Sequence, residues 1–216
     1  MSEKKKRIAI VEDHIMVREH IMNLVNNEPD MEVCGEADNI RHGMEMIRKV
    51  LPDLAIVDIT LVGGGNGLEI IKSLKMLSLP IPVLVLSMHE ESLYAERALR
   101  AGAKGYITKH RASHELLSAV RRVLAGEVYV SEKMVSKVLQ KMTSSIPSRS
   151  VDALSDRELA VLEHIGHGKS SRAIAKTLGL GVATVDTYRA RIKDKMNLQN
   201  AFELQDFAIR WLRERE

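Results

Sequence analysis

The segment Leu54-Ala55-Ile56-Val57-Asp58 decides the fold: four apolar residues in succession end at a carboxylate. A nearly continuous apolar run of this length is typical of a strand that is buried on both faces of a parallel sheet. Comparable short runs rich in apolar and β-branched residues occur at Ile8–Val11, Met31–Cys34, Val83–Leu86 and Gly105–Ile107. We therefore predict five strands in the first part of the chain.

Amphipathic segments separate these strands. Val17, Ile21, Leu24 and Val25 recur at helical intervals, as do the apolar residues of 116–124. Strands that alternate with helices in this way imply right-handed βαβ units and a parallel sheet covered on both faces. The expected first domain is a doubly wound α/β domain with a five-stranded parallel sheet, over residues 1–128.

Composition narrows the class of protein. The 216 residues suffice for two small domains, and a hydrophobic content of 45% supports a folded core. The single cysteine, Cys34, excludes an internal disulfide and a cysteine-rich zinc site. No apolar run approaches the length of a membrane span. We expect a soluble cytoplasmic protein with no membrane partner.

Charged and polar residues follow the predicted strands at one edge of the sheet. Glu12 and Asp13 follow the first strand, Asp58 the third, Ser87 the fourth and Lys109 the fifth. Because the carboxyl ends of parallel strands collect ligands, these side chains are expected to converge. Three carboxylates repel one another unless a cation such as Mg²⁺ lies among them, and a carboxylate there can attack a phosphoryl group. Helix caps or solvated loop residues are the alternative interpretation of each position.

The second part of the chain has a different pattern. Ser131 is a plausible N-cap of an amphipathic helix over 131–142, and a polar segment over 143–150 follows it. We predict a linker with a helix over 129–150. Four helices fit residues 151–216, and the first opens with a capping box of Ser155 and Glu158. Residues 131–216 hold 15 basic and 11 acidic side chains, a net charge of +4 that favours a polyanionic partner.

A glycine-containing turn at 179–181 separates the second and third of these helices, as in a helix-turn-helix. On the third helix, over 183–196, Val185 and Ile192 are expected to face inward. Small residues on the opposite face let a helix enter a major groove, and basic residues at its margins reach phosphates. The candidate DNA-contacting residues are Thr184, Asp186, Thr187, Arg189, Ala190, Arg191 and Lys193. An ordinary amphipathic helix with a solvated charged face is the alternative.

The chain resembles response regulators of the NarL/FixJ type over nearly its whole length. The residues that carry the first half of this resemblance are Glu12, Asp13, Asp58, Ser87, Tyr106 and Lys109. The resemblance implies a flavodoxin-like receiver domain in which a sensor histidine kinase phosphorylates Asp58. Members of this family are phospho-accepting regulators and not enzymes in the ordinary sense.

The resemblance also assigns roles around the phosphorylated residue. Asp13, Asp58 and the backbone carbonyl of Thr60 would coordinate Mg²⁺, with Glu12 acting through water. Lys109 would pair with the phosphoryl oxygens, Ser87 would turn towards them, and Tyr106 would swing inward. These movements would change the surface formed by the fourth helix and the fifth strand.

The string from Leu154 to Leu198 resembles a LuxR-type helix-turn-helix. This implies binding to double-stranded promoter DNA, with dimers formed through the fourth helix and paired half-sites on the DNA. Phosphorylation of the receiver would free the DNA-binding domain and favour dimers.

Two departures from the family pattern stand out. Val62 replaces a proline, and glycines at 63–65 and 67 lengthen the following loop by one residue, which puts the lifetime of the phosphorylated form in doubt. Asp186 stands where many relatives have a basic or polar residue. An aspartate there repels phosphates but can accept from cytosine N4.

Three other functions are alternatives to this one. A phosphatase of the haloacid-dehalogenase type would carry Asp-x-Asp after the first strand, whereas this chain has Glu12-Asp13-His14. The glycine run suggests nucleotide binding, but Leu68 occupies the place of the third fingerprint glycine. A receiver whose last domain binds protein instead of DNA is the third alternative.

Overall fold

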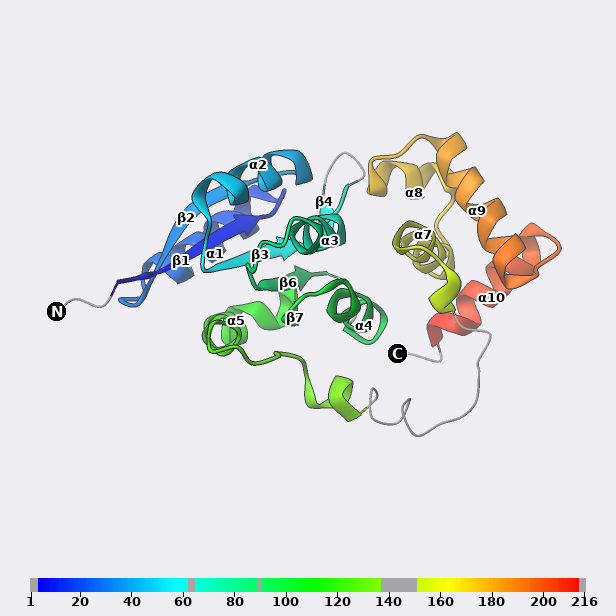
Figure 1. Cartoon of the computed structure of the whole chain (residues 1–216). Coiled ribbons are helices and arrows are strands. Elements are labelled where there is room, and N and C mark those ends of the chain that lie inside the picture. The colour runs from blue at the N-terminus through cyan, green and yellow to red at the C-terminus, as the bar shows by residue number, and fades with distance from the viewer. Residues whose placement is uncertain (1–3, 62–64, 89–90, 137–150, 214–216) are drawn as a thin grey trace. The chain divides into compact units, whose positions relative to one another are not determined.

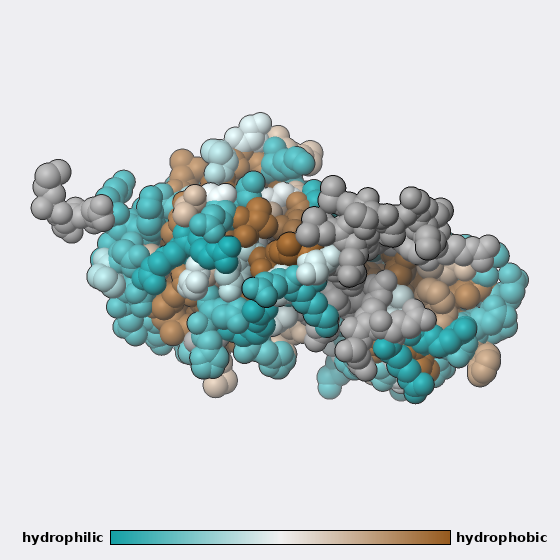
Figure 2. Space-filling model, turned by 90° about the horizontal axis from the view of Figure 1, so that it is seen from below, coloured by the Kyte–Doolittle hydropathy of each residue, from teal (hydrophilic) through white to brown (hydrophobic). Residues whose placement is uncertain are grey.

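The structure is a computed structural model that describes residues 4–61, 65–88, 91–136 and 151–213 (Figure 1). The chain divides into two compact units, Met1–Thr143 and Ser144–Glu216. Within the described residues, no helix is long and apolar enough to cross a bilayer. Hydrophilic side chains cover much of the face drawn in Figure 2.

The first unit is built on a five-stranded parallel sheet with the order β2-β1-β3-β6-β7. This confirms the predicted doubly wound α/β class. Its strands are β1 (Lys6–Val11), β2 (Met31–Ala37), β3 (Leu54–Asp58), β6 (Val83–Ser87) and β7 (Gly105–Thr108). β3 lies at the centre, and each of its five residues is buried.

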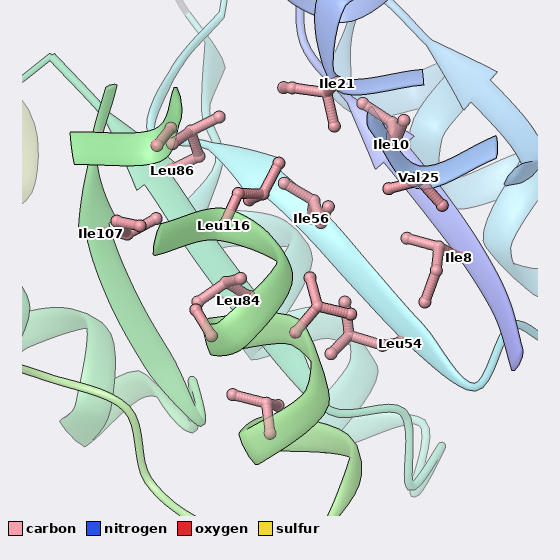
Figure 3. Close-up of a cluster of buried hydrophobic side chains, with 14 of the residues drawn as sticks. Ile8, Ile10, Ile21, Val25, Leu54, Ile56, Leu84, Leu86, Ile107 and Leu116 are labelled. Carbon is pink, nitrogen blue, oxygen red and sulfur yellow. The ribbon is translucent and has the colours of Figure 1, made fainter. Parts of the chain in front are cut away.

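Five helices flank this sheet: α1 (Ile15–Asn26), α2 (Ile40–Val50), α3 (Leu68–Met76), α4 (Glu91–Ala101) and α5 (Lys109–Leu124). Alternate strand residues such as Ile8, Ile10 and Ile56 join Ile21 of α1 and Leu116 of α5 in one buried cluster (Figure 3). The intervening strand residues face the other side, where Gly43 of α2 packs closely on Val11. Both faces are covered, which explains why the strands read as continuous apolar runs.

The first unit continues past residue 128, where the sequence placed the end of the first domain. Tyr129 forms a parallel bridge with Gly105 at the β7 edge of the sheet. The backbone N–H of Tyr106 donates to the Tyr129 carbonyl at 2.8 Å, and the N–H of Tyr129 donates to the Lys104 carbonyl at 2.9 Å. A Cβ at position 105 would lie 3.1 Å from the Tyr129 carbonyl oxygen, so glycine permits this close approach.

Side chains hold the same segment in place. The Tyr129 hydroxyl donates to Glu115 of α5 at 2.8 Å, and the Ser131 N–H donates to Glu91 of α4 at 2.7 Å. Ser131 also caps the helix predicted after it, because its hydroxyl accepts the Met134 N–H at 3.2 Å. This helix is described over 132–136, and the remainder of the predicted helix and linker, up to residue 150, lies outside the described residues.

A short hairpin follows β3 and was not predicted. β4 (Thr60–Leu61) pairs antiparallel with β5 (Gly65–Asn66), and residues 62–64 of the predicted longer loop lie outside the described residues. The hairpin returns the chain to Gly67, whose N–H donates to the Ile59 carbonyl at 2.8 Å. A Cβ on Gly67 would lie 1.9 Å from the Asp58 carbonyl oxygen, so the turn beside Asp58 requires glycine there.

The second unit consists of the four predicted helices, α7 (Asp156–Gly166), α8 (Ser171–Leu178), α9 (Val182–Met196) and α10 (Ala201–Arg213), after a short 3₁₀ turn at Val151–Ala153. The predicted capping box starts α7: Glu158 N–H donates to Ser155 Oγ, and Ser155 N–H donates to a Glu158 carboxylate oxygen. α8 ends at Gly179, whose φ of 63° favours glycine. The predicted all-α helix-turn-helix class is confirmed.

Candidate functional site

The strand ends bring the predicted acidic residues together at one edge of the sheet. Glu12 directly follows β1, and Asp58 is the last residue of β3. Both side chains are buried, with exposed fractions of 1% for Glu12 and 2% for Asp58. Two buried carboxylates this close require a compensating cation, because burial and mutual repulsion both disfavour their charged forms.

Lys109 supplies that positive charge. Its Nζ lies 2.8 Å from Asp58 Oδ2 and 2.6 Å from Glu12 Oε2, and its side chain is itself buried. Burial alone would lower the pKa of Lys109, but the Asp58 and Glu12 carboxylates outweigh burial, and the pKa is raised. Burial raises the pKa of Asp58 to about 6, and Glu12 adds to this rise, whereas Lys109 opposes it.

Asp13 and His14 complete the cluster. One ligand atom from each of Glu12, Asp13, His14 and Asp58 lies within 4.8 Å of the others. Oxygen atoms from carboxylates are the donors that Mg²⁺ prefers, so the three acidic residues fit that ion. The predicted ligand from Thr60 is its carbonyl, and the contact observed there is a different one: the Thr60 N–H donates to Asp58 Oδ1 at 3.2 Å.

The two predicted switch residues lie inside the first unit. Ser87 ends β6 and is fully buried, and Tyr106 lies within β7 with an exposed fraction of 1%. The structure thus places Tyr106 in the interior of the first unit. Its backbone also bonds to Tyr129, so this residue joins the edge of the sheet to the segment after α5.

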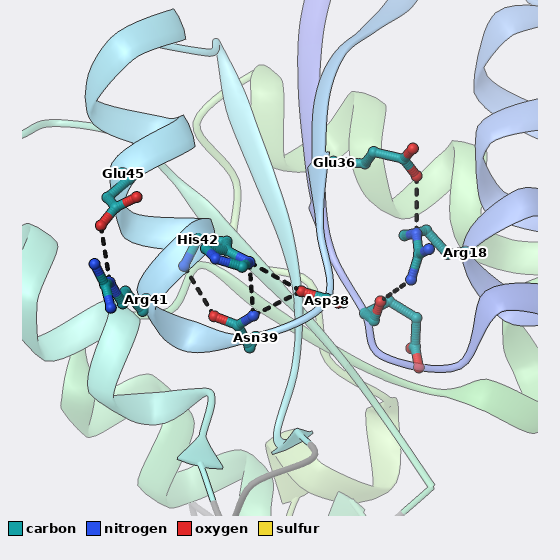
Figure 4. A network of polar contacts seen from close by, with 8 residues as sticks. Arg18, Glu36, Asp38, Asn39, Arg41, His42 and Glu45 are labelled. Atoms are coloured by element: carbon teal, nitrogen blue, oxygen red, sulfur yellow. Dashed lines mark hydrogen bonds and ion pairs between the residues drawn. The ribbon is translucent and has the colours of Figure 1, made fainter.

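Arg18 of α1 fixes the end of β1 and was not among the predicted residues. Its Nη1 donates to the Glu12 carbonyl at 2.7 Å, and its Nε donates to Glu36 of β2 at 2.8 Å. Figure 4 shows this pairing of Arg18 on α1 and Glu36 on β2, two elements that follow one another in the chain. Only the tertiary arrangement reveals this role, because nothing in the spacing of 12, 18 and 36 signals it.

The helix α9 presents the predicted polar face to solvent. Val185 and Ile192 are buried and Tyr188 is half-buried. On the other side, the residues Thr184, Asp186, Thr187, Ala190 and Arg191 are exposed, and Arg189 and Lys193 are half-buried. Ser171, at the start of α8, donates its hydroxyl hydrogen to Asp186 Oδ1 at 2.8 Å. Ser171 was not predicted, and this bond holds Asp186 at the junction of the two helices.

Known proteins match both units of this chain. The family model described as "Response regulator receiver domain" matches residues 8–121, and the model described as "Bacterial regulatory proteins, luxR family" matches residues 152–208. The chain is a response regulator of the LuxR family. This response regulator is 36% identical to BvgA of Bordetella pertussis over 204 residues, covering 94% of this chain and 97% of BvgA. It is 33% identical to the oxygen regulatory protein NreC of Staphylococcus carnosus, covering 94% and 97% of the two chains.

Solved structures agree with the fold of this response regulator. A LuxR-family response regulator from Aurantimonas is 30% identical, with a TM-score of 0.60, and the match covers 65% of this chain and all of that one. RcsB of Salmonella enterica serovar Typhimurium, in a structure bound to the rprA promoter, has a TM-score of 0.62 at 22% identity and matches 95% and 98% of the two chains. The resemblance inferred from the sequence is therefore confirmed for the family and for the fold.

Proposed function

We propose that this response regulator is a transcription factor whose Asp58 accepts a phosphoryl group from a sensor histidine kinase. The observation that carries the proposal is the contact of Lys109 Nζ with both Asp58 and Glu12, inside a pocket that would otherwise hold unbalanced charge. The name of BvgA describes that relative as a transcription regulator of virulence factors, which supports transcriptional control.

The chemistry follows from this arrangement. An Asp58 carboxylate oxygen attacks the phosphorus of the phosphohistidine, the P–N bond of the donor breaks, and an acyl phosphate forms. With its pKa at about 6, Asp58 is mostly ionised at neutral pH and able to attack. Lys109 is close enough to Asp58 that its ammonium group can form an ion pair with the phosphoryl oxygens after the transfer.

The acidic cluster is proposed to hold Mg²⁺. Asp13, Asp58 and the Thr60 carbonyl are the direct ligands in this proposal, and Glu12 acts through water. When bound, the ion neutralises charge on the incoming phosphoryl group. In this proposal Ser87, which is buried at the end of the strand next to β3, turns towards the phosphoryl oxygens.

The output is proposed to be binding to double-stranded promoter DNA by the second domain, residues 151–216. The exposed face of α9 offers small residues at its centre, and Arg189, Arg191 and Lys193 provide the positive charge for phosphates. Phe202 of α10 has an exposed fraction of 78%, which suits the proposed dimer contact through that helix. A phosphorylated dimer would bind paired half-sites. We propose a cytoplasmic location, because the protein must contact both DNA and the kinase there.

The test selects bound duplexes from a random DNA pool with the full chain, before and after phosphorylation by a small-molecule acyl phosphate. We expect a paired half-site motif that is enriched more strongly after phosphorylation, and no such gain in Asp58→Asn. Equal enrichment in both states would remove the proposed control by Asp58. No enrichment in either state would favour a last domain that binds protein.

A further inference from the structure

We propose that His14 gives the acidic cluster a nitrogen ligand, so that the same cluster binds imidazole-preferring transition metals such as Ni²⁺ and Zn²⁺ in competition with Mg²⁺. The inference rests on the proposed magnesium site and adds to it both a residue and a class of ion. In this assignment His14 Nδ1 binds the ion together with carboxylate oxygens of Glu12 and Asp13.

The ring nitrogen already has the spacing of a ligand in a coordination shell. His14 Nδ1 lies 3.0 Å from Glu12 Oε1 and 2.8 Å from Asp13 Oδ1. Two ligands at right angles on a metal, each bound at about 2.1 Å, lie about 3 Å apart. A metal ion can therefore enter between these three atoms with small adjustments of the side chains.

The backbone of His14 is fixed on both sides. Its N–H donates to Glu12 Oε1 at 3.0 Å, and its carbonyl accepts the Arg18 N–H at 2.9 Å in the first turn of α1. Arg18 in turn holds the Glu12 carbonyl. The His14 side chain is 63% exposed, so solvent reaches the cluster on the side of this residue.

The donor set decides the class of metal. Mg²⁺ is bound through oxygen, and an imidazole nitrogen adds little to its binding, whereas imidazole suits Zn²⁺, Ni²⁺ and Cu²⁺. A metal binds imidazole through a ring nitrogen that carries no hydrogen, so a neutral ring bound through Nδ1 carries its hydrogen on Nε2.

The test compares Ni²⁺ and Mg²⁺ binding to the full chain by isothermal titration calorimetry, counting only the Ni²⁺ binding that Mg²⁺ competes with. We expect His14→Gln to weaken this Ni²⁺ binding by about tenfold or more and to change Mg²⁺ affinity by less than about twofold. An unchanged Ni²⁺ affinity in His14→Gln would overturn the inference. Retained Mg²⁺ affinity shows in the same samples that the variant is folded.

His42 provides a matched control. It lies on α2, its side chain is also 63% exposed, and its Nδ1 lies 3.3 Å from Asp38, with Asn39 beside it (Figure 4). His42→Gln should leave both affinities unchanged, and an equal loss of Ni²⁺ binding in this variant would count against a role particular to His14.

Asp58→Asn separates this inference from the proposed function. If this variant binds Mg²⁺ as tightly as the parent, the proposed magnesium site fails, whereas a loss of Ni²⁺ affinity in His14→Gln would still support the nitrogen ligand. If Asp58→Asn weakens Mg²⁺ binding but His14→Gln leaves Ni²⁺ binding unchanged, the proposed function stands and the role of His14 falls.

Discussion

Replacing Asp58 with asparagine should stabilise the first unit when no divalent cation is present. The reason is the pKa of Asp58, which burial and the Glu12 carboxylate raise from 3.8 to about 6 despite Lys109. A carboxyl group with a raised pKa in the folded state stabilises the fold at low pH, and this contribution is lost as the pH rises through the folded-state pKa. The asparagine side chain keeps the shape and cannot ionise.

The magnitude follows from the same values. At about 1.4 kcal/mol for each pH unit, a rise in pKa from 3.8 to about 6 corresponds to about 3 kcal/mol at pH 8. At pH 5 the same linkage gives about half of this free-energy difference, because folded Asp58 is mostly protonated there whereas unfolded Asp58 is mostly ionised. We therefore expect Asp58→Asn to raise the free energy of unfolding by up to about 3 kcal/mol at pH 8 and by about 1.5 kcal/mol at pH 5.

The assay is urea unfolding of both proteins in EDTA, followed by circular dichroism at the two pH values. Adding Mg²⁺ at about 100 times its dissociation constant should stabilise the parent protein by about 3 kcal/mol and leave the variant nearly unchanged, which closes the gap. A variant that is less stable than the parent at pH 8, or a difference that does not grow between pH 5 and pH 8, would refute the reasoning.

Three further predictions follow from single positions. Gly67→Ala should lower the free energy of unfolding by more than about 2 kcal/mol, because its Cβ would lie 1.9 Å from the Asp58 carbonyl oxygen. Urea unfolding checks this, and Gly181→Ala is the control because the nearest atom to its Cβ would be 3.6 Å away. Ser155→Ala should lower the free energy of unfolding of the second unit by about 1 kcal/mol, because the capping box is lost. Fluorescence of the chain's one tryptophan follows this unfolding, and an unchanged midpoint would contradict the prediction. Asp186→Ala should bind random-sequence duplexes about fivefold more tightly and discriminate less at one base pair, as measured by fluorescence anisotropy; weaker binding would show that the carboxylate supports DNA binding.

The sheet and its polar edge could be predicted from the sequence because each buried strand is a short apolar run that stops at a charged or polar residue. Asp58 ends β3 and Ser87 ends β6, as the pattern indicates. The helices of the second unit begin within a residue or so of the predicted positions, because caps such as Ser155 and glycine at 179 leave local signals.

The features that were missed leave no pattern in the order of the residues. The strands β4 and β5 contain two residues each, which is too few for any period to appear. Arg18 acts through the Glu12 carbonyl, and no side-chain pattern records a bond to a backbone atom. No periodicity in the sequence singles out His14, and its contact with two carboxylates depends on the path of the chain between β1 and α1.

Tyr129 has a consequence for how the first unit behaves when the chain is cut. β7 is an edge strand, and an open edge is a template on which a second molecule can add its own strand. By bonding to Lys104 and Tyr106, the backbone of Tyr129 occupies part of that edge from within the same chain. A fragment that stops at residue 128 would expose it and would be prone to aggregation, whereas one that extends to residue 136 keeps the edge covered.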